Sequence, residues 1–118
     1  MIDLKAEITP FRMVLAHREP LQLMVEMTNN SNKAQMVSLE ISGGNYLAFD
    51  KGGRMRIITK KIESFNPGET IRDYYNVYPA ANADRGIETI TVLLAEHYNN
   101  SYQYIQSKKV KEISLRID

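Results

Sequence analysis

The feature that most constrains this chain is a period-two alternation of apolar and polar residues, clearest between Lys61 and Leu94. Residues 70–78 are rich in β-branched and aromatic side chains, which suit a pleated, half-buried surface. Residues 87–94 place alternate apolar side chains on one face, namely Ile90, Val92 and Leu94. Helical spacing also fits part of this segment, but its Thr-Ile-Thr-Val run favours a strand because β-branched side chains lose χ1 freedom in a helix. The region therefore predicts two strands.

Turn signals separate these strands from one another and from their neighbours. Asn66-Pro67-Gly68-Glu69 predicts a type II turn, since proline presets φ at the first central position and glycine supplies positive φ at the next. Further strands are predicted at 2–9, at 11–15 after a bend at Pro10, and at 21–28, 36–41 and 46–49. Three more are predicted at 54–62 with a bulge, 102–106 and 110–117, the last two divided by an irregularity at Lys108 and Lys109. Seven to nine short strands without a convincing helix predict an all-β, two-sheet antiparallel sandwich.

Part of this pattern resembles a known family. The run Ile62-Glu-Ser-Phe-Asn-Pro-Gly-Glu69 is followed by a strand, a loop and then Gly86-Ile-Glu-Thr-Ile-Thr-Val92. This order is similar to the middle of immunoglobulin-like β-sandwich domains of the CARDB or NEW3-like kind, although those domains often carry a tyrosine where Glu88 or Thr89 stands here. The resemblance implies an immunoglobulin-like sandwich, and a kind of domain often repeated in archaeal and bacterial surface proteins.

Length and composition exclude several classes of function. A chain of 118 residues fits one domain, 1–118, of ordinary size. Without cysteine it has no disulfide, thiolate metal site or cysteine nucleophile. A net charge of +1 gives no long-range field for nucleic acid or an anionic membrane, so neither is predicted as a partner. Two basic clusters are expected on opposite sheets as solubilising residues: Arg54, Arg56, Lys60 and Lys61, and Lys108, Lys109 and Lys111.

The first residues alternate apolar and charged side chains, without a basic segment followed by an apolar one. They do not read as a signal peptide, and no run approaches the roughly 20 apolar residues of a spanning helix. The expectation is a soluble, cytoplasmic protein. A fragment of a larger secreted protein remains the alternative.

Residues for catalysis or metal binding are sparse. The two histidines, His17 and His97, are expected in exposed turns or strand ends, away from the three or four convergent ligands that a transition metal needs. Ser101 follows His97 by four residues, but no nucleophile motif surrounds it. We therefore predict no cofactor, no metal and no enzymatic activity.

Two groups of polar and aromatic residues are candidates for binding. In the predicted strand 70–78, Arg72, Tyr74 and Tyr78 share the face opposite the core, which predicts an exposed aromatic stripe. The loops near Asn30 and Asn99 should project from the same end of a sandwich. They would present Asn30, Asn32, Tyr98, Asn100 and Tyr102, a composition that recurs in binding loops. The alternative is that these are ordinary turn and strand residues.

Each of these loops also contains a glycosylation sequence, Asn29-Asn30-Ser31 and Asn99-Asn100-Ser101. In an exported protein, sugars would cover the loops; otherwise the repeats reflect asparagine-rich turns. The sequence favours a non-catalytic protein-interaction module that binds a partner, or itself, through these loops or through an exposed edge strand. The alternatives are a carbohydrate- or ligand-binding sandwich using Tyr74 and Tyr78, and a structural spacer of a surface assembly.

Overall fold

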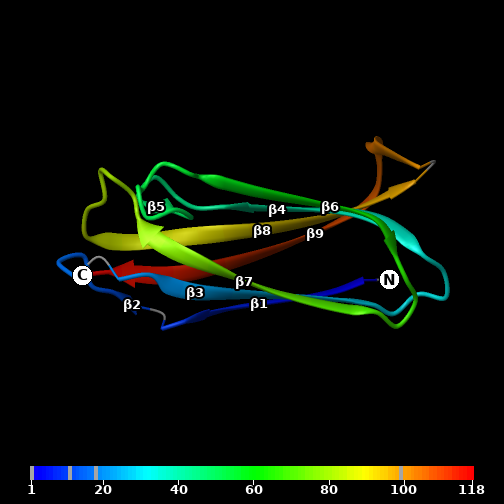
Figure 1. Cartoon of the computed structure of the whole chain (residues 1–118), viewed down its shortest axis with the longest axis horizontal. Coiled ribbons are helices and arrows are strands. Elements are labelled where there is room, and N and C mark those ends of the chain that lie inside the picture. Colours follow the sequence, from blue (N-terminus) through cyan, green and yellow to red (C-terminus); the bar gives the residue numbers. More distant parts are fainter. Residues whose placement is uncertain (1, 11, 18, 99) are drawn as a thin grey trace.

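The computed structural model describes residues 2–10, 12–17, 19–98 and 100–118, and these form nine strands in two facing sheets (Figure 1). One sheet has the order β1-β3-β7-β5 and the other β2-β9-β8-β4-β6. The bounds are β1 Ile2–Thr9, β2 Arg12–Met13, β3 Leu21–Asn29, β4 Gln35–Ser42, β5 Leu47–Ala48, β6 Ile57–Phe65, β7 Thr70–Pro79, β8 Gly86–Tyr98 and β9 Ser101–Ile117. The predicted all-β sandwich is confirmed; its pairs are antiparallel except the short β2–β9 contact.

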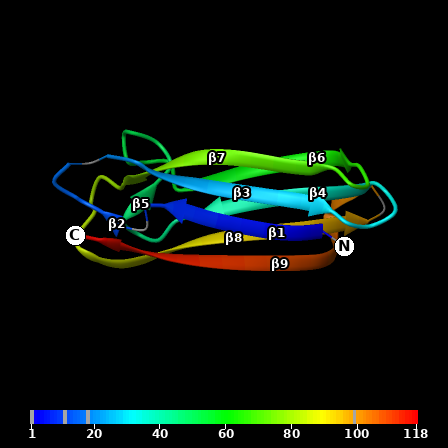
Figure 2. The same ribbon diagram turned by 90° about the horizontal axis from the view of Figure 1, so that it is seen from below.

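The sandwich is long and narrow, measuring 48 × 24 × 19 Å, and its two layers can be followed in Figure 2. The start of the described chain lies at one end, together with the β3–β4 turn, the β6–β7 turn and the β8–β9 hairpin (Figure 1). The last residue lies at the other end. The predicted meeting of the loops near Asn30 and Asn99 at one end therefore holds for their described parts.

The core forms between the sheets from the alternate positions that the sequence predicts. Ile90, Val92 and Leu94 are buried; on β4, Val92 pairs with Ile41 and Leu94 pairs with Leu39. The inner faces of β1 and β3 supply the opposite wall, and Leu115 and Ile117 close the last strand. Burying each large aliphatic side chain is worth roughly 1.5–3 kcal/mol, so this alternation supplies the main favourable term for the fold. The described residues include no helix with the length and apolar character of a membrane span.

The predicted turn at 66–69 has the expected geometry. Glu69 donates its N–H to the Asn66 carbonyl at 3.1 Å, and Gly68 has φ of 76°. The side chain of Glu69 accepts a further bond from the Asn66 N–H at 2.9 Å. Proline and glycine thus shape the turn that carries the chain from β6 in one sheet to β7 in the other, as their backbone preferences require.

Two predicted irregularities lie elsewhere. The bulge expected within 54–62 is found at Glu63 and Ser64, which together face Met36, while 57–62 pairs regularly with β4. The irregularity expected at Lys108 and Lys109 is also misplaced, since both pair in register with β8. Between Ile105 and Ser107 the chain instead gains an extra residue, and a second irregularity follows in the hairpin.

The basic clusters were predicted on opposite sheets, and this is wrong. The lysines of the first cluster lie on β6, which Arg54 and Arg56 precede, and the second cluster lies on β9. Both strands belong to the same five-stranded sheet and are separated by β4 and β8. The error follows from the connection order, because β6 pairs with β4 and does not cross to the other layer.

Each long open side of the sandwich carries an ion pair between the sheets. On one side Lys60 Nζ lies 2.5 Å from Asp73 Oδ2, which also accepts a bond from the Tyr75 hydroxyl at 3.3 Å. Burial and the neighbouring Asp73 carboxylate raise the pKa of Tyr75 to about 12. On the other side Lys109 Nζ lies 3.8 Å from Asp3 Oδ1.

Candidate binding surface at the hairpin end

The β8–β9 hairpin forms the candidate site because its tip departs from regular pairing. Tyr98 pairs with Ser101, but the next pair joins His97 to Ile105, so residues 102–104 have no counterpart on β8. Asn100 has φ of 52°, a left-handed conformation that asparagine tolerates better than most residues. These extra residues interrupt the ladder, and such bulges bend a strand. The tip, orange in Figure 1, rises from the end of the sandwich.

His97 fastens this bulge to the sheet. Its Nδ1 lies 3.1 Å from the Tyr104 carbonyl oxygen, and its Nε2 lies 2.7 Å from Ser38 Oγ on β4. Because a carbonyl can only accept, Nδ1 carries a proton, and in this tautomer of the neutral ring Nε2 accepts from the Ser38 hydroxyl. His97 is only 5% exposed, so the expectation of an exposed strand-end histidine is wrong. The exposed histidine is His17, on the loop after β2.

The bulge exposes a small aromatic and aliphatic surface. The rings of Tyr98 and Tyr104 pack with centroids 5.3 Å apart, yet remain 44% and 47% exposed. Ile105, the next residue along the strand, is also 44% exposed, and it lines the neighbouring hollow over the outer face of the sheet. Tyrosine offers contact area at low entropic loss, which suits this surface to binding. Of the three residues, the sequence predicted Tyr98 alone.

The neighbouring β3–β4 turn is held from inside by Asn29. Its Nδ2 donates to the Lys33 carbonyl at 3.0 Å and the Phe65 carbonyl at 2.8 Å. Its Oδ1 accepts from the Ser31 N–H at 2.9 Å and from the Ser31 hydroxyl at 2.6 Å. The Asn29 side chain is fully buried, so it cannot carry a sugar in the folded protein. The other predicted acceptor, Asn99, lies outside the described residues.

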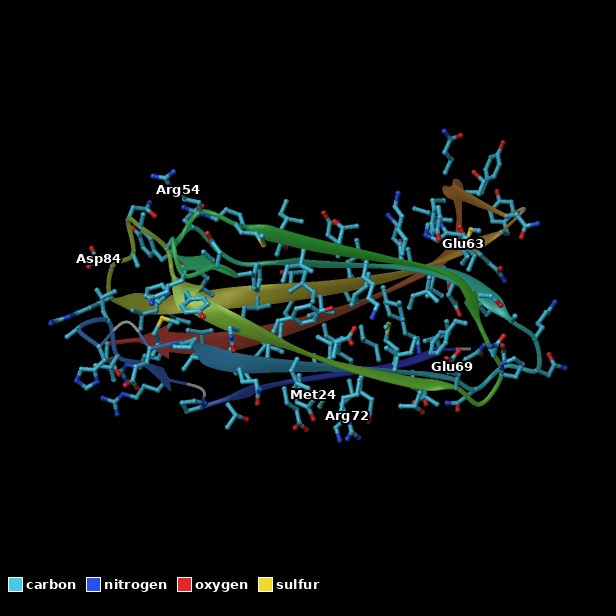
Figure 3. The ribbon with its side chains drawn as sticks, in the orientation of Figure 1. Met24, Arg54, Glu63, Glu69, Arg72 and Asp84 are labelled. Carbon is cyan, nitrogen blue, oxygen red and sulfur yellow. The ribbon has the colours of Figure 1, made fainter. Side chains whose placement is uncertain are left out.

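A groove of about 450 Å³ separates this turn from the hairpin. Its walls are mainly polar, and the residues that matter here are Lys33, Gln35, Glu63, Tyr98, Asn100 and Gln106. Figure 3 shows Glu63 near the hairpin, at the end of the sandwich away from Arg54 and Asp84. Of the residues proposed for binding, Tyr98 and Asn100 both line this groove. Asn30 and Asn32 are not in the groove: Asn30 bonds Asp3, and Asn32 is exposed on the turn.

Tyr102 faces a different surface from Tyr98. Its ring packs edge-on against His97 with centroids 5.1 Å apart, and Lys61 Nζ lies 5.0 Å from its ring centroid. It lines a hollow of about 330 Å³ over the outer face of the five-stranded sheet, with Ser38, Lys61 and Ile105. The Tyr102 hydroxyl is buried without a hydrogen-bond partner among the described residues. We infer that Tyr102 supports the bulge by packing, aided by the cation–π contact.

The predicted stripe of Arg72, Tyr74 and Tyr78 lies on the other sheet, away from the hairpin groove. Figure 3 shows Arg72 and Met24 projecting on the same side of the molecule. Arg72 Nε donates to Glu26 Oε1 at 2.9 Å, and this bond raises the pKa of Arg72. Tyr74 is 55% exposed, but Tyr78 is half-buried where β7 pairs with β5. Of the two tyrosines expected to be exposed on this face, only Tyr74 is exposed.

A wider hollow of about 800 Å³ lies at the opposite end of the sandwich, where Arg12 and Arg116 both bond the carboxylate of Asp118. Burial acts to raise the pKa of Asp118, but the hydrogen bonds from the two arginines outweigh it and lower that pKa. These guanidinium groups are engaged within the chain. The described residues contain no cluster of three His, Asp or Glu side chains able to hold a metal.

Sequence reasoning missed Lys33, Gln35, Glu63 and Gln106 in the groove, and the Ser38–His97 pair beside it. The groove residues come from four separate segments, so no local motif signals them. A usable signal existed for Ser38, because it lies on the polar phase of β4, opposite the core residues Val37 and Leu39. Only the pairing of β4 with β8 brings it to His97.

No family model matches this chain, and no curated protein matches its sequence. Among solved structures, it is similar to native alpha-2-macroglobulin from Escherichia coli, with TM-score 0.69 and 14% identity over 98% of this chain. It spans 16% of that structure, which runs from domain MG7 to the C-terminus.

Two further likenesses each cover 98% of this chain at 13% identity. The CARDB domain of a Pyrococcus furiosus protein, solved in complex with di-metal ions, has TM-score 0.63 and is matched over 93% of its length. The alkylpurine DNA glycosylase AlkC of Pseudomonas fluorescens, solved bound to DNA, has TM-score 0.55 and is matched over 30%. At such identities these structures show the fold alone: an immunoglobulin-like β-sandwich.

Proposed function

We propose that this domain is a non-catalytic interaction module that binds a protein partner at the hairpin end. The observation that carries the proposal is the exposure of Tyr98, Tyr104 and Ile105, at 44–47%, on a hairpin projecting beside a polar groove. Large aromatic side chains dominate binding energy when a partner buries them. The groove would add polar contacts around this apolar tip, as the rim of an interface does.

The way the tip is held favours binding without large rearrangement. The bond from His97 to the Tyr104 carbonyl and the packing of Tyr102 fix the bulge before any partner arrives. A surface that is already ordered loses less conformational entropy on association. Lys33 and Glu63 place one charge of each sign on the groove, which would orient a partner of complementary charge.

The pair formed by Ser38 and His97 has the form of a nucleophile and its base, with the Tyr104 carbonyl as the orienting group. Acyl transfer also requires N–H donors that stabilise the developing oxyanion. Ser38 lies within β4, which pairs with β6 on one side and β8 on the other, so the amides around it are committed to the sheet. This supports the non-catalytic proposal.

The test is photo-crosslinking from single positions in cells of the source organism. A benzophenone amino acid replaces Tyr104 in one variant and Tyr74 in a matched control, since Tyr74 is comparably exposed on the opposite sheet. We expect a discrete crosslinked protein from position 104 and none from position 74. Tyr104→Ala should then weaken binding of that protein by roughly tenfold or more, as for an interface anchor.

Equal crosslinking from both positions, or undiminished affinity of Tyr104→Ala for the captured protein, would overturn the proposal. Circular dichroism of each variant controls for loss of folding. A second control, Tyr74→Ala, should leave the affinity unchanged because that ring lies on the other sheet.

A further inference from the structure

The long strand β9 has a largely unpaired edge. On one side it pairs with β8 from Ile117 back to Ser101. On the other side the described residues supply only β2, which pairs with Arg116 and Ile117. Upstream of Arg116, the outer backbone edge of this strand therefore has no neighbouring strand among the described residues.

The direction of the backbone groups along this edge follows from its last residue. Asp118 donates its N–H to the Met13 carbonyl at 2.8 Å, and its own carbonyl accepts from the Leu15 N–H at 2.8 Å. Both groups of Asp118 thus point away from β8. Pairing with β8 is regular from Ile117 to Ser107, and successive residues of a strand direct these groups to alternate sides. The even-numbered residues, including Lys108, Val110 and Glu112, therefore present their N–H and C=O groups at the free edge.

The side chains of these three residues are self-complementary. All three lie on the outer face of the sheet, and Val110 is 53% exposed. Neither Lys108 nor Glu112 forms an ion pair within the described chain. Val110 is equally spaced between them, with a positive charge two residues before it and a negative charge two residues after it.

We propose that a second copy of this chain pairs with β9 antiparallel, with the two-fold axis at Val110. Each Val110 then faces Val110 of the partner subunit, and Lys108 faces Glu112 of the partner subunit twice. In this register Lys108, Val110 and Glu112 form backbone hydrogen bonds to the partner strand, and their side chains face those of the same partner residues. One register therefore satisfies both the backbone hydrogen bonds and the charge pairs. Two five-stranded sheets become one continuous sheet, by the strand addition that open edges favour.

The register also places Lys109 opposite Lys111 of the partner subunit on the inner side. Lys109 is already within 3.8 Å of the Asp3 carboxylate, and Asp3, Lys109 and Lys111 line one shallow groove. The Asp3 carboxylate offsets part of the repulsion between the lysines, and the remaining repulsion limits the affinity of the dimer. The opposite edge strand of the same sheet, β6, is a poorer candidate because its bulge at Glu63 and Ser64 interrupts the edge.

The first experiment uses the absence of cysteine from the chain. In Val110→Cys, the two introduced thiols would face one another across the axis, where opposed residues of a hydrogen-bonded pair have Cα atoms about 5.5 Å apart. A disulfide spans about 4.4–6.8 Å between Cα atoms, so mild oxidation should give a covalent dimer. Ile57→Cys is the matched control: it is also 53% exposed, on the opposite edge strand, and should stay monomeric. Equal or faster dimerisation of the control would overturn the proposal.

The second experiment exchanges charges without cysteine, by sedimentation equilibrium. Glu112→Lys and Lys108→Glu should each weaken the dimer at least tenfold, because each turns both ion pairs into like-charge contacts. The double variant Lys108→Glu/Glu112→Lys should restore it. A strictly monomeric wild-type chain, or a double variant no better than the single ones, would overturn the proposal. Tyr104→Ala should leave the dimer intact, which separates this result from any failure of binding at the hairpin.

Discussion

Two turns at the same end of the sandwich carry the same three residues, Asn-Asn-Ser, at 29–31 and 99–101. In the first, the leading asparagine is buried and bonds the carbonyls of Lys33 and Phe65 as well as Ser31. In the second, Asn100 is exposed at the hairpin tip in a left-handed conformation. The first turn is held by one of its own residues, because the Asn29 side chain bonds the Phe65 carbonyl on β6. The hairpin that carries the second is held by His97, which lies outside the tripeptide and bonds the Tyr104 carbonyl. The same tripeptide therefore serves as an internal brace in one place and as a hairpin connection in the other.

Asn29→Asp should break the first turn most severely. A carboxylate there would face two carbonyl oxygens in a buried site, which should lower the free energy of unfolding by about 3–5 kcal/mol at neutral pH. Burial would raise the folded-state pKa of this carboxyl above its unfolded value of about 3.9. The loss relative to wild type should therefore be full above the folded-state pKa and shrink as pH falls towards the unfolded value.

The measurement for this variant is urea unfolding of Asn29→Asp and wild type at several pH values, compared as a difference at each pH. A difference that does not change with pH would mean that the introduced carboxyl is solvated, and that the site is not closed as described.

Asn29→Ala should have the next largest effect, lowering the free energy of unfolding by about 2–3 kcal/mol. The buried Phe65 carbonyl loses the Asn29 donor, and the Lys33 carbonyl keeps only the bond from the Ser31 hydroxyl. Asn30→Ala is the matched control, since the Asn30 side chain is exposed and bonds only Asp3 among the described residues. It should change stability by less than about 0.5 kcal/mol. Similar losses in the two variants, measured by urea unfolding, would contradict the division of roles within the first turn.

His97→Ala tests the organisation of the second turn. Removing the imidazole frees the Tyr104 carbonyl and the Ser38 hydroxyl, for an expected loss of about 1–2 kcal/mol. Hydrogen exchange should speed up in residues 101–106 more than in the β3–β4 turn. His17→Ala, at an exposed histidine on the loop after β2, should leave both measurements unchanged. Uniform acceleration across both turns would show that they are not held separately.

The smallest expected effect is at the hairpin tip. Asn100→Gly should raise the free energy of unfolding by about 0.5 kcal/mol, since glycine adopts positive φ without a side-chain penalty. Asn32→Gly, in the first turn at a residue without positive φ, should lower it by a similar amount through the greater flexibility of the unfolded chain. Thermal unfolding of the two variants should therefore shift in opposite directions. Shifts of the same sign would contradict the contrast between the turns.

The layered fold was predictable because side chains along a strand point alternately to the core and to solvent, and this alternation can be seen directly in the sequence. Ile90, Val92 and Leu94 needed no knowledge of their partners to be placed inside. The turn at 66–69 was equally accessible, since proline and glycine have backbone preferences of their own. These features depend on the residue and its immediate neighbours.

The candidate site was only partly predictable, because its residues meet through strand pairing. The burial of His97 depends on Ser38, which is 59 positions away in the chain. Asn29 is held by the carbonyl of Phe65, and Tyr102 by His97 and Lys61. Alternation places Tyr102 on a face, but the bulge that redirects it arises from a mismatch in strand register. Composition therefore pointed to the hairpin end of the molecule, and of the residues it proposed for binding only Tyr98 and Asn100 line the groove there.

The opposite positions of Ile2 and Asp118 along the 48 Å axis have a mechanical consequence (Figure 1). Tension applied at these two residues would run parallel to the strands. It would shear β1 against β3 and β9 against β8. In this geometry many backbone hydrogen bonds are loaded at the same time, whereas in peeling they would break one after another. Separating these two residues along the axis would therefore require many ladder hydrogen bonds to break at the same time.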